Sequence, residues 1–361
     1  MTEDILFDRK GGVATVTLSR PQALNAFTLG MYRAFDPKLR AWAENPAVHA
    51  VVIRGAGDRA FCAGGDVRAV YEAGRGISGE RDLTVVFFRE EYELIRRVHR
   101  FPKPYLAIID GITMGGGAGV SVNGACRVAT ERTLLAMPET SIGLFPDVGA
   151  TRFLNRCPGH LGRYLGLTGA RIGAADALYC GFATHFVPRD RLPILTVALE
   201  TAAWRAGDEA NQVETVLAEF THETEPAPLR ARQEPIDRCF APETAEAILD
   251  ALAAEAAAGG PHAEWAAQTR TTLLAKSPTS LKTTLRQLIV GRDYDLDAAL
   301  ILEYRLTQHV MDGHDFYEGV RAVVVDKDQM PRWQPASLAE VDDAMVDSYF
   351  APIGAQELRF E

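Results

Sequence analysis

Several features that place proteins in well-known classes are missing from this chain. Its 361 residues include five cysteines, an odd number at wide spacings, and none of them forms a C-x-x-C pair. This usage favours reduced thiols over a disulfide framework. The most apolar stretch, residues 105–122, is interrupted by Asp110 and several glycines. We therefore expect no membrane-spanning segment and no membrane partner.

The chain also has no excess of positive charge. Lys and Arg number 38 against 48 Asp and Glu, which gives a formal net charge of −10, and no basic block stands out. A nucleic-acid partner is therefore not expected. The first four residues, Met-Thr-Glu-Asp, do not begin a basic segment followed by an apolar one, so no signal peptide is predicted. These absences together predict a soluble, cytoplasmic protein.

Common cofactor and nucleophile motifs are absent as well. The eight histidines form no H-E-x-x-H pattern, so no metal site is predicted. Gly119-Val120-Ser121-Val122-Asn123 approaches the serine-hydrolase elbow, but Asn123 breaks the motif and Ser121 is better interpreted as a packing residue. The run Gly115-Gly116-Gly117 lacks dinucleotide-binding spacing because position 120 is Val. We expect no cofactor.

The pattern that is present indicates α/β layers up to about residue 190. Apolar and alternating segments predict a hairpin over residues 5–18 and buried strands at 50–53, 105–109, 127–130, 133–136 and 183–187. Helical spacing between them predicts helices over 26–45, 83–100, 148–156, 160–167 and 174–179. Strands that alternate with helices are typical of an α/β fold.

Beyond residue 190 the strand signals fade. Helical stretches are predicted over 249–258, 279–290 and 296–310, while four prolines favour a loose connector over 222–242. We therefore predict two regions, an α/β core over 1–190 and a mainly helical C-terminal region over 191–361. The tail from residue 329 is expected to wrap around the body of the protein.

Two glycine-rich turns can present backbone N–H groups to an anion. Gly115-Gly116-Gly117 follows a predicted strand and opens a helix, where the first amides lack intrahelical partners. Ala63-Gly64-Gly65-Asp66 is a second strand-to-helix turn. Each also has a structural interpretation, as tight helix packing for the first and as an ordinary turn with an Asp66 N-cap for the second. Two such turns favour an oxyanion hole, which usually needs two convergent donors.

Two carboxylates eight positions apart, Glu139 and Asp147, lie among apolar residues. Burial there should raise their pKa values and fit them for acid, base or nucleophile chemistry. The alternative is structural, with Glu139 as a helix-start acid and Asp147 as the N-cap of the following helix. Likewise, His185 and Cys62 are better interpreted as structural residues than as reactive ones.

These motifs resemble the enoyl-CoA hydratase/isomerase (crotonase) superfamily over roughly residues 5–190. The resemblance implies a spiral of ββα turns, followed here by the extended helical region. It implies that the amides of Gly65 and Gly116 bind the thioester oxygen. It also implies that the loop of Ala63, Gly64 and Asp66 holds the adenine end of coenzyme A. The expected partner is thus an acyl-CoA substrate, and relatives suggest a homo-oligomer of three or six chains.

Within the superfamily, hydratases carry a second glutamate at the position of Gly119, and its absence removes their usual means of activating water. The strings around Gly111–Gly117, Ala136–Thr140 and Ile142–Gly149, together with Phe88–Tyr92, are similar to the 3-hydroxyisobutyryl-CoA hydrolase subfamily. That resemblance implies hydrolysis of a short branched 3-hydroxyacyl-CoA, as in valine breakdown.

In this scheme Glu139 attacks the carbonyl or activates water, and Asp147 orients the 3-hydroxyl or the acyl group or assists proton transfer. By the resemblance, Glu91 lines the acyl pocket and contacts the hydroxyl. No metal and no redox cofactor is needed. Three alternatives stay open: an enoyl-CoA hydratase or isomerase, a hydrolase of a related 3-hydroxyacyl-CoA, and a catalytically silent acyl-CoA-binding protein.

Overall fold

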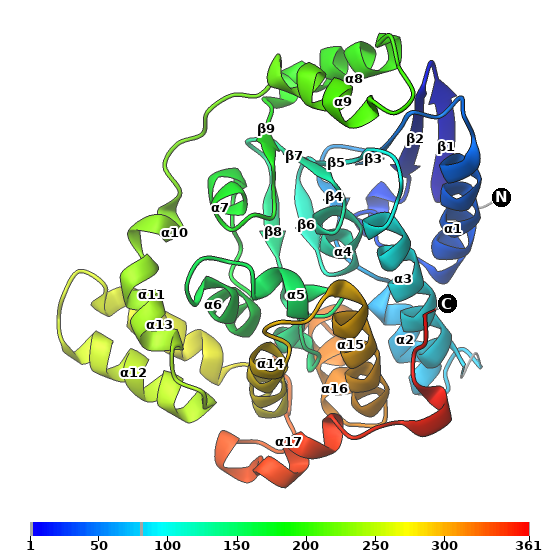
Figure 1. Cartoon of the computed structure of the whole chain (residues 1–361). Coiled ribbons are helices and arrows are strands. Elements are labelled where there is room, and N and C mark those ends of the chain that lie inside the picture. The colour runs from blue at the N-terminus through cyan, green and yellow to red at the C-terminus, as the bar shows by residue number, and fades with distance from the viewer. Residues whose placement is uncertain (1–2, 80–81, 361) are drawn as a thin grey trace. The chain divides into compact units, whose positions relative to one another are not determined.

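A computed structural model describes residues 3–79 and 82–360 (Figure 1). Met1 and Thr2, which belong to the segment used to predict the absence of a signal peptide, lie outside the described residues. The chain forms two compact units. The first contains residues up to Gly65, Glu93–Ala136 and Ile172–Pro228, and the second contains Asp66–Tyr92, Met137–Arg171 and Leu229–Glu361. The division predicted at residue 190 stays a prediction.

The first unit contains a six-stranded sheet with the order β1-β2-β3-β5-β7-β9. The predicted hairpin is confirmed, because β1 and β2 pair antiparallel, and the other neighbours are parallel. Buried apolar residues dominate the parallel strands β3, β5 and β7, as expected for strands that are covered on both faces, whereas most of β1 is exposed. The strands are β1 (Ile5–Lys10), β2 (Val13–Leu18), β3 (Ala50–Gly55), β5 (Tyr105–Ile109), β7 (Cys126–Ala129) and β9 (His185–Phe186).

A second, three-stranded parallel sheet of the first unit carries the glycine turns. Its order is β4-β6-β8, with β4 (Ala60–Cys62), β6 (Ile112–Met114) and β8 (Leu134–Ala136). The helices of this unit are α1 (Leu29–Glu44), α4 (Gly116–Val122), α7 (Ala174–Tyr179), α8 (Leu192–Thr201) and α9 (Glu209–Ala218), with the end of α3 (Leu83–His99). The α1 prediction is confirmed: Thr28 caps its N-terminus, and Met31, Phe35, Leu39 and Trp42 are buried.

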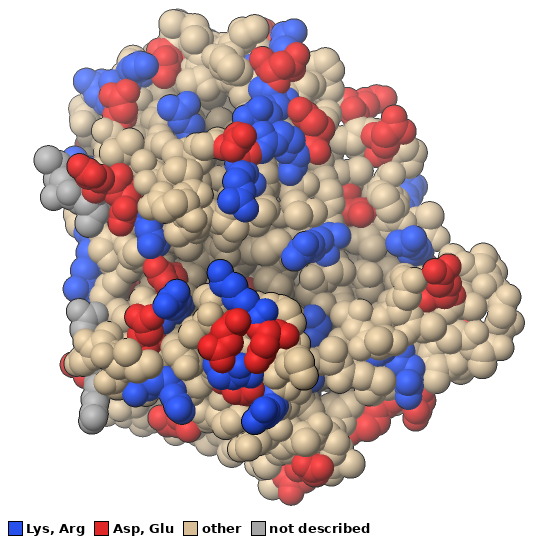
Figure 2. All heavy atoms as spheres, turned by 180° about the vertical axis from the view of Figure 1, so that it is seen from behind, with Lys and Arg blue, Asp and Glu red and all other residues tan. Residues whose placement is uncertain are grey.

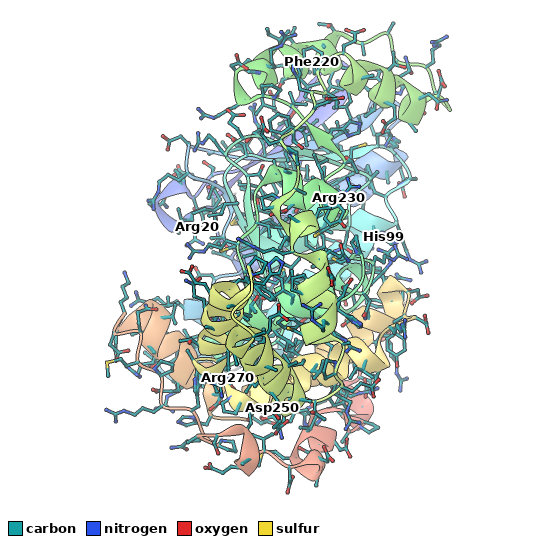
Figure 3. The ribbon with its side chains drawn as sticks, turned by 90° about the vertical axis from the view of Figure 1, so that its left-hand side faces the viewer. Arg20, His99, Phe220, Arg230, Asp250 and Arg270 are labelled. Atoms are coloured by element: carbon teal, nitrogen blue, oxygen red, sulfur yellow. The ribbon has the colours of Figure 1, made fainter. Side chains whose placement is uncertain are left out.

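One core of the first unit lies between the six-stranded sheet and the pair α8 and α9. Val52, Leu106 and Val128 from the sheet belong to the same cluster as Leu195 and Leu199 from α8. Phe220, labelled in Figure 3, completes this cluster just after α9, and the guanidinium of Arg191 lies 5.5 Å from the centre of its ring. The helices after residue 190 thus supply core to the sheet.

The second unit is mainly helical. It contains α2 (Val67–Gly74) and the start of α3, then α5 (Ala150–Leu154) and α6 (Leu161–Thr168). The later helices are α10 (Pro228–Ala231), α11 (Gln233–Phe240), α12 (Ala245–Ala257), α13 (Ala263–Leu274), α14 (Pro278–Val290), α15 (Leu296–Met311), α16 (Asp315–Val320) and α17 (Asp343–Tyr349). Figure 3 labels Asp250 on α12 and Arg270 on α13, two helices that pack together.

The predicted loose connector over 222–242 is wrong, because α10 and α11 occupy most of it. Pro228 is the first residue of α10, and Pro235 lies in the first turn of α11, where a missing N–H costs no intrahelical hydrogen bond. Ile236 and Phe240 are buried, so the segment contributes to the core of its unit.

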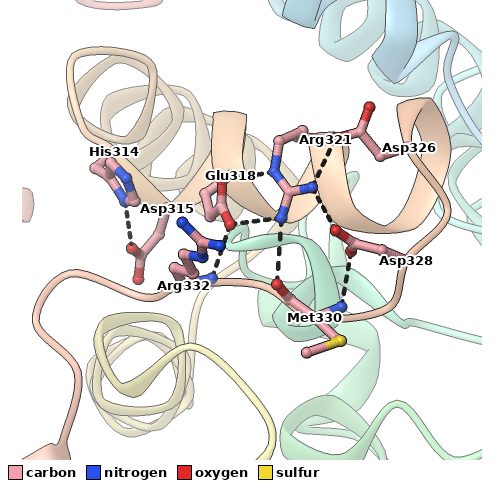
Figure 4. A network of polar contacts seen from close by, with 8 residues as sticks. All are labelled: His314, Asp315, Glu318, Arg321, Asp326, Asp328, Met330 and Arg332. Carbon is pink, nitrogen blue, oxygen red and sulfur yellow. Dashed lines mark hydrogen bonds and ion pairs between the residues drawn. The ribbon is translucent and has the colours of Figure 1, made fainter.

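A polar network secures the segment after α16 (Figure 4). The guanidinium of Arg321 donates to the carboxylates of Glu318, Asp326 and Asp328 and to the carbonyl oxygen of Met330. These hydrogen bonds raise the pKa of Arg321 and keep it charged. Figure 2 shows one face of the molecule, on which basic and acidic side chains lie near one another.

Candidate active site

The two glycine turns lie next to one another in the first unit. The turn Ala63-Gly64-Gly65 follows β4, and Gly115 and Gly116 follow β6, the neighbouring strand. A Cβ placed on Gly64 would lie 3.7 Å from the amide nitrogen of Gly116. Gly64 has φ 115° and Gly115 has φ 47°, which L-residues with side chains rarely adopt. Glycine therefore lets both chains approach closely and turn sharply.

The amides predicted to bind an oxyanion are available. Gly116 is the first residue of α4, where an N–H has no intrahelical acceptor. Within the described residues, neither the N–H of Gly65 nor that of Gly116 donates a hydrogen bond to another backbone group. Gly117 serves packing instead, because a Cβ there would overlap the carbonyl of Cys62. The packing interpretation of the glycine run is thus confirmed at Gly117, and the oxyanion role of Gly116 stays a prediction.

Ala63 and Asp66 flank this turn with structural contacts. The N–H of Ala63 donates to the carbonyl of Leu24 at 3.0 Å. Asp66 is the N-cap of α2, and its carboxylate accepts a hydrogen bond from the N–H of Ala69 at 3.3 Å. The alternative interpretation of Asp66 as an N-cap is therefore confirmed.

A cluster of buried acids occupies the second unit. Glu91, Glu139, Asp147 and Glu303 are between 0% and 5% exposed. Glu139 begins a short 3-10 helix, Glu139–Ile142, that follows Met137 and Pro138. Its Oε2 atom is buried and accepts no hydrogen bond from any residue that the structure describes. Most buried carboxylates are paired, so an unpaired oxygen suggests that something outside the chain pairs with it.

Asp147 lies on the turn before α5, but it does not cap that helix. The N-cap residue is Gly149, and the Asp147 carboxylate instead accepts a hydrogen bond from the hydroxyl of Tyr92 at 2.7 Å. The backbone beside Asp147 is unusual, since Val148 has φ 57° and Gly149 has φ 90°. A β-branched residue in the left-handed region is rare and costs free energy. The capping alternative for Asp147 is wrong.

Burial shifts the pKa values of Glu139, Asp147 and Glu303 upward. Burial, reinforced by the charge of Asp147 and by Glu91 and Glu303, raises the pKa of Glu139 well above its usual range. Burial also raises the pKa of Asp147 to about 6, against the lowering effect of the Tyr92 hydroxyl. Acids close together in an apolar setting cannot all be ionised at neutral pH, so the cluster retains protons.

Sequence reasoning missed Tyr92, Gln287 and Glu303. Glu303 lies on α15, and its two carboxylate oxygens accept hydrogen bonds from the amides of Gly149 and Thr151 at 2.7 and 2.8 Å. Burial and the charge of Asp147 raise the pKa of Glu303 to about 8. A carboxylate among the apolar residues of α15 was the available signal, because a charged side chain is rarely buried without a partner.

The residues predicted to be structural make contacts that fit this interpretation. The hydroxyl of Ser121 donates to the carbonyl of Gly117 at 2.7 Å within α4. His185 pairs with the carboxylate of Glu214, and the Sγ atom of Cys62 is buried against the turn. All five cysteines are free and buried, as predicted for reduced thiols.

The chain belongs to the enoyl-CoA hydratase/isomerase family, whose model matches residues 13–350. It is 40% identical, with a TM-score of 0.88, to the crystal structure of a carnitinyl-CoA dehydratase from Mycobacterium thermoresistibile, over 100% of this chain and 99% of that one. An enoyl-CoA hydratase from Rhodobacter sphaeroides 2.4.1 matches at the same identity and TM-score, over 99% of this chain and 100% of that one. The predicted crotonase-type α/β fold with a helical C-terminal region is confirmed.

Curated relatives carry a more specific name. The chain is 45% identical to the mitochondrial 3-hydroxyisobutyryl-CoA hydrolase of Mus musculus, over 99% of this chain and 91% of the relative. The human enzyme of the same name is 43% identical over the same shares. The predicted resemblance to this subfamily is confirmed.

The prediction of a cytoplasmic location is wrong, because these relatives are named as mitochondrial proteins. Reduced, buried thiols occur in proteins of several compartments, so the cysteine pattern could not distinguish a mitochondrial from a cytoplasmic location. Within the described residues, no helix has both the length and the apolar character needed to cross a lipid bilayer.

Proposed function

We propose that the protein hydrolyses a short branched 3-hydroxyacyl-CoA thioester, namely 3-hydroxyisobutyryl-CoA, to the free hydroxy acid and coenzyme A. One observation carries the proposal: a buried acid cluster built around Glu139, in a chain 45% identical to hydrolases of that substrate over 99% of its length. The position of Gly119 supports hydrolysis over hydration, because it is a buried glycine inside α4 and offers no second acid.

We assign the oxyanion hole to the amides of Gly65 and Gly116. The family resemblance implies that these amides and the acid cluster serve the same reaction. As the thioester carbonyl becomes tetrahedral, its oxygen gains negative charge, which fixed N–H donors stabilise without reorganising. Loss of one such donor typically costs about 100- to 1000-fold in rate.

Glu139 is the proposed reacting carboxylate, since its Oε2 is the buried oxygen without a partner. Two balanced routes lead to the products. In the first, Glu139 attacks the carbonyl carbon and the C–S bond breaks, which gives an anhydride and the thiolate of coenzyme A; water then cleaves the anhydride to the hydroxy acid and the Glu139 carboxylate, and a proton from that water goes to the thiolate. In the second, Glu139 accepts a proton from water, the hydroxide attacks, and the same proton passes to the departing sulfur. Asp147 and Glu91 are the proposed contacts of the substrate hydroxyl.

Turnover tests the proposal. Coenzyme A thiol release is followed with a disulfide reagent across an acyl-CoA panel that includes crotonyl-CoA and 3-hydroxypropionyl-CoA. Glu139→Gln should lower turnover by about 100- to 10,000-fold and spare CoA binding. Glu264→Gln, which removes an exposed carboxylate of the same unit, should leave turnover unchanged. Rapid hydration of crotonyl-CoA without thiol release would overturn the proposal in favour of a hydratase, and CoA binding without turnover would indicate a silent binding protein.

The two routes are separated by a single turnover in H₂¹⁸O. Attack by Glu139 leaves the label in the protein when water opens the anhydride at the Glu139 carbonyl. General-base catalysis leaves the Glu139 carboxylate unlabelled. Mass spectrometry of the peptide that contains Glu139 reads the result.

We also propose that the chain forms a homo-oligomer, as the family resemblance suggests. Its support is the apolar face of α8, where Ile194 and Val197 are each 55% exposed. Light scattering tests this, and a monomer at micromolar concentration would contradict it.

A further inference from the structure

The turn that carries Asp147 needs external support. It runs from Pro146 to Thr151 and passes through two consecutive left-handed residues, Val148 and Gly149. Conformations of this kind persist when the surrounding structure determines them several times over. The helix that follows, α5, has five residues and no side-chain cap of its own. The turn is therefore held by groups that lie elsewhere in the sequence.

Glu303 provides that support from α15. Its carboxylate bridges the amide of Gly149, next to the strained Val148, and the amide of Thr151 two positions further on. It is fully buried, and both of its oxygens are used. Two hydrogen bonds accepted by one planar carboxyl group fix the orientation of both peptide groups, because each bond is short.

Neighbouring groups reinforce the same turn. On α14, the side-chain amide of Gln287 donates to the carbonyl of Pro146 at 2.7 Å and to the hydroxyl of Thr151 at 2.8 Å. Tyr304, next to Glu303, packs edge-to-face on Tyr92 with ring centroids 6.4 Å apart. Tyr92 in turn donates to the Asp147 carboxylate. Helix α15 thus supports the backbone of the turn through Glu303, and through Tyr304 it contacts Tyr92, which donates to Asp147.

An ordinary helix cap would not need this arrangement. Ser, Thr or Asn at the N-cap position of Gly149 could accept from the amide of Thr151 from within the turn, without burying a charge. Glu303 instead places another acid in the cluster with Glu91, Glu139 and Asp147, where like charges disfavour one another. Such an electrostatic cost is expected where supporting groups must hold a reacting group in its productive geometry.

We propose that Glu303 is a positioning residue that acts through Asp147: its carboxylate fixes the turn in the conformation that presents the Asp147 side chain to the substrate. This inference rests on the proposed hydrolysis. If Glu303 has this role, α15 in the helical C-terminal region contributes a positioning residue to the active site.

A double-mutant cycle tests the proposal, with the variants Glu303→Gln, Asp147→Asn and both together. Glu303→Gln keeps the size of the side chain, but its NH₂ group faces one of the two amide donors, so one hydrogen bond is lost. We expect kcat to fall by about 100-fold, the loss typical of a misplaced reacting group, with KM changed by less than about threefold. In the Asp147→Asn background the same substitution should cost less than about threefold, because groups that act as a unit are not additive.

A matched control separates positioning from stability. Asp295 caps the N-terminus of α15 through the amide of Ala298 at 2.8 Å. Asp295→Ala should destabilise the same helix while leaving kcat within about twofold of wild type. If Glu303→Gln and Asp295→Ala lower kcat alike, or if the losses from Glu303→Gln and Asp147→Asn multiply, the positioning role is wrong.

The pH profile gives a second readout that a purely structural role would not change. The ionised carboxylate accepts best from two N–H groups, and the pKa of Glu303 is raised to about 8. The titratable groups around it are Glu91, Tyr92, Glu139 and Asp147, and Arg89 donates to the hydroxyl of Tyr304. Wild-type kcat should therefore keep rising up to about pH 8. Glu303→Gln should change the shape of that rise, to which Glu139 also contributes because burial raises its pKa as well; a kcat profile with the wild-type shape would overturn the proposal.

Two further outcomes stay distinguishable. Absence of thiol release by the wild-type protein contradicts the proposed function itself, whereas normal hydrolysis with an additive cycle contradicts the role of Glu303 alone. If Glu303→Gln does not fold, Glu303→Asp replaces it in the same cycle. The shorter side chain reaches one amide less well, and the same non-additivity is expected.

Discussion

The buried Asp147 carboxyl should make the protein less stable as the pH rises, and Asp147→Asn should remove that dependence. Burial raises the pKa of Asp147 from 3.8 to about 6. Between these values the folded state holds a proton that the unfolded state has released. Stability therefore falls as the pH rises through this window, because the unfolded state binds fewer protons there.

The size of the effect follows from the shift. A difference of roughly 2 pKa units, at 1.36 kcal/mol for each unit, corresponds to about 3 kcal/mol. The asparagine of Asp147→Asn cannot ionise, yet its side-chain oxygen can still accept the hydrogen bond that Tyr92 donates to Asp147. Relative to wild type, the variant should thus gain about 3 kcal/mol in the free energy of unfolding between pH 4 and pH 7. It should also lose thioesterase activity, a trade-off expected when a reacting group is held in an unfavourable site.

Urea denaturation followed by circular dichroism, at pH values from 4 to 7, measures the effect. The matched control is Gln287→Leu, which removes hydrogen bonds to the same turn but no titrating group. It should lower stability by a similar amount at every pH. Removing the charge of Asp147 also lowers the pKa of Glu303, so the remaining pH dependence of the variant should move to lower pH. Parallel curves for wild type and Asp147→Asn would refute the reasoning.

Three further outcomes are expected. Tyr92→Phe removes the hydroxyl that lowers the pKa of Asp147, so the acid limb of the kcat/KM profile should move above about pH 6, and an unmoved limb would count against the pairing. Gly117→Ala should destabilise the protein by about 1–3 kcal/mol in thermal melts and reduce turnover, because its Cβ would overlap the carbonyl of Cys62 and displace the backbone next to Gly116. Thr28→Ala removes the α1 cap and should cost about 1 kcal/mol by the same measurement with kcat unchanged, so a fall in kcat would contradict its purely structural role.

The local elements of the fold were predictable because their signals are local. The buried strand at 105–109 has the predicted bounds, since a short run of apolar residues ends at Asp110 and Gly111. The hairpin likewise follows from alternation around Gly11 and Gly12. The connector over 222–242 was misjudged because its prolines were taken as helix breakers, whereas Pro228 and Pro235 lie in first turns, where proline is tolerated.

The candidate site also has a part that was predictable from local sequence and a part that was not. Burial of Glu139 and Asp147 was predictable from their apolar sequence neighbours. Their partners were not, because Tyr92 and Glu303 lie 55 and more than 150 positions from the turn that they support. No local pattern reports a contact between helices so far apart in sequence, and only tertiary packing brings them together.

The burial of all five thiols also bears on how the protein behaves toward oxidants and thiol reagents. A disulfide reagent that reports free coenzyme A should find no accessible sulfur on the folded chain, since Cys62, Cys126, Cys157, Cys180 and Cys239 are all shielded. Reagent can reach them when the surrounding structure opens, so their reaction rates measure the free energy of each local opening. The same solution can thus report catalysis through coenzyme A and conformational opening through the protein's own sulfur atoms.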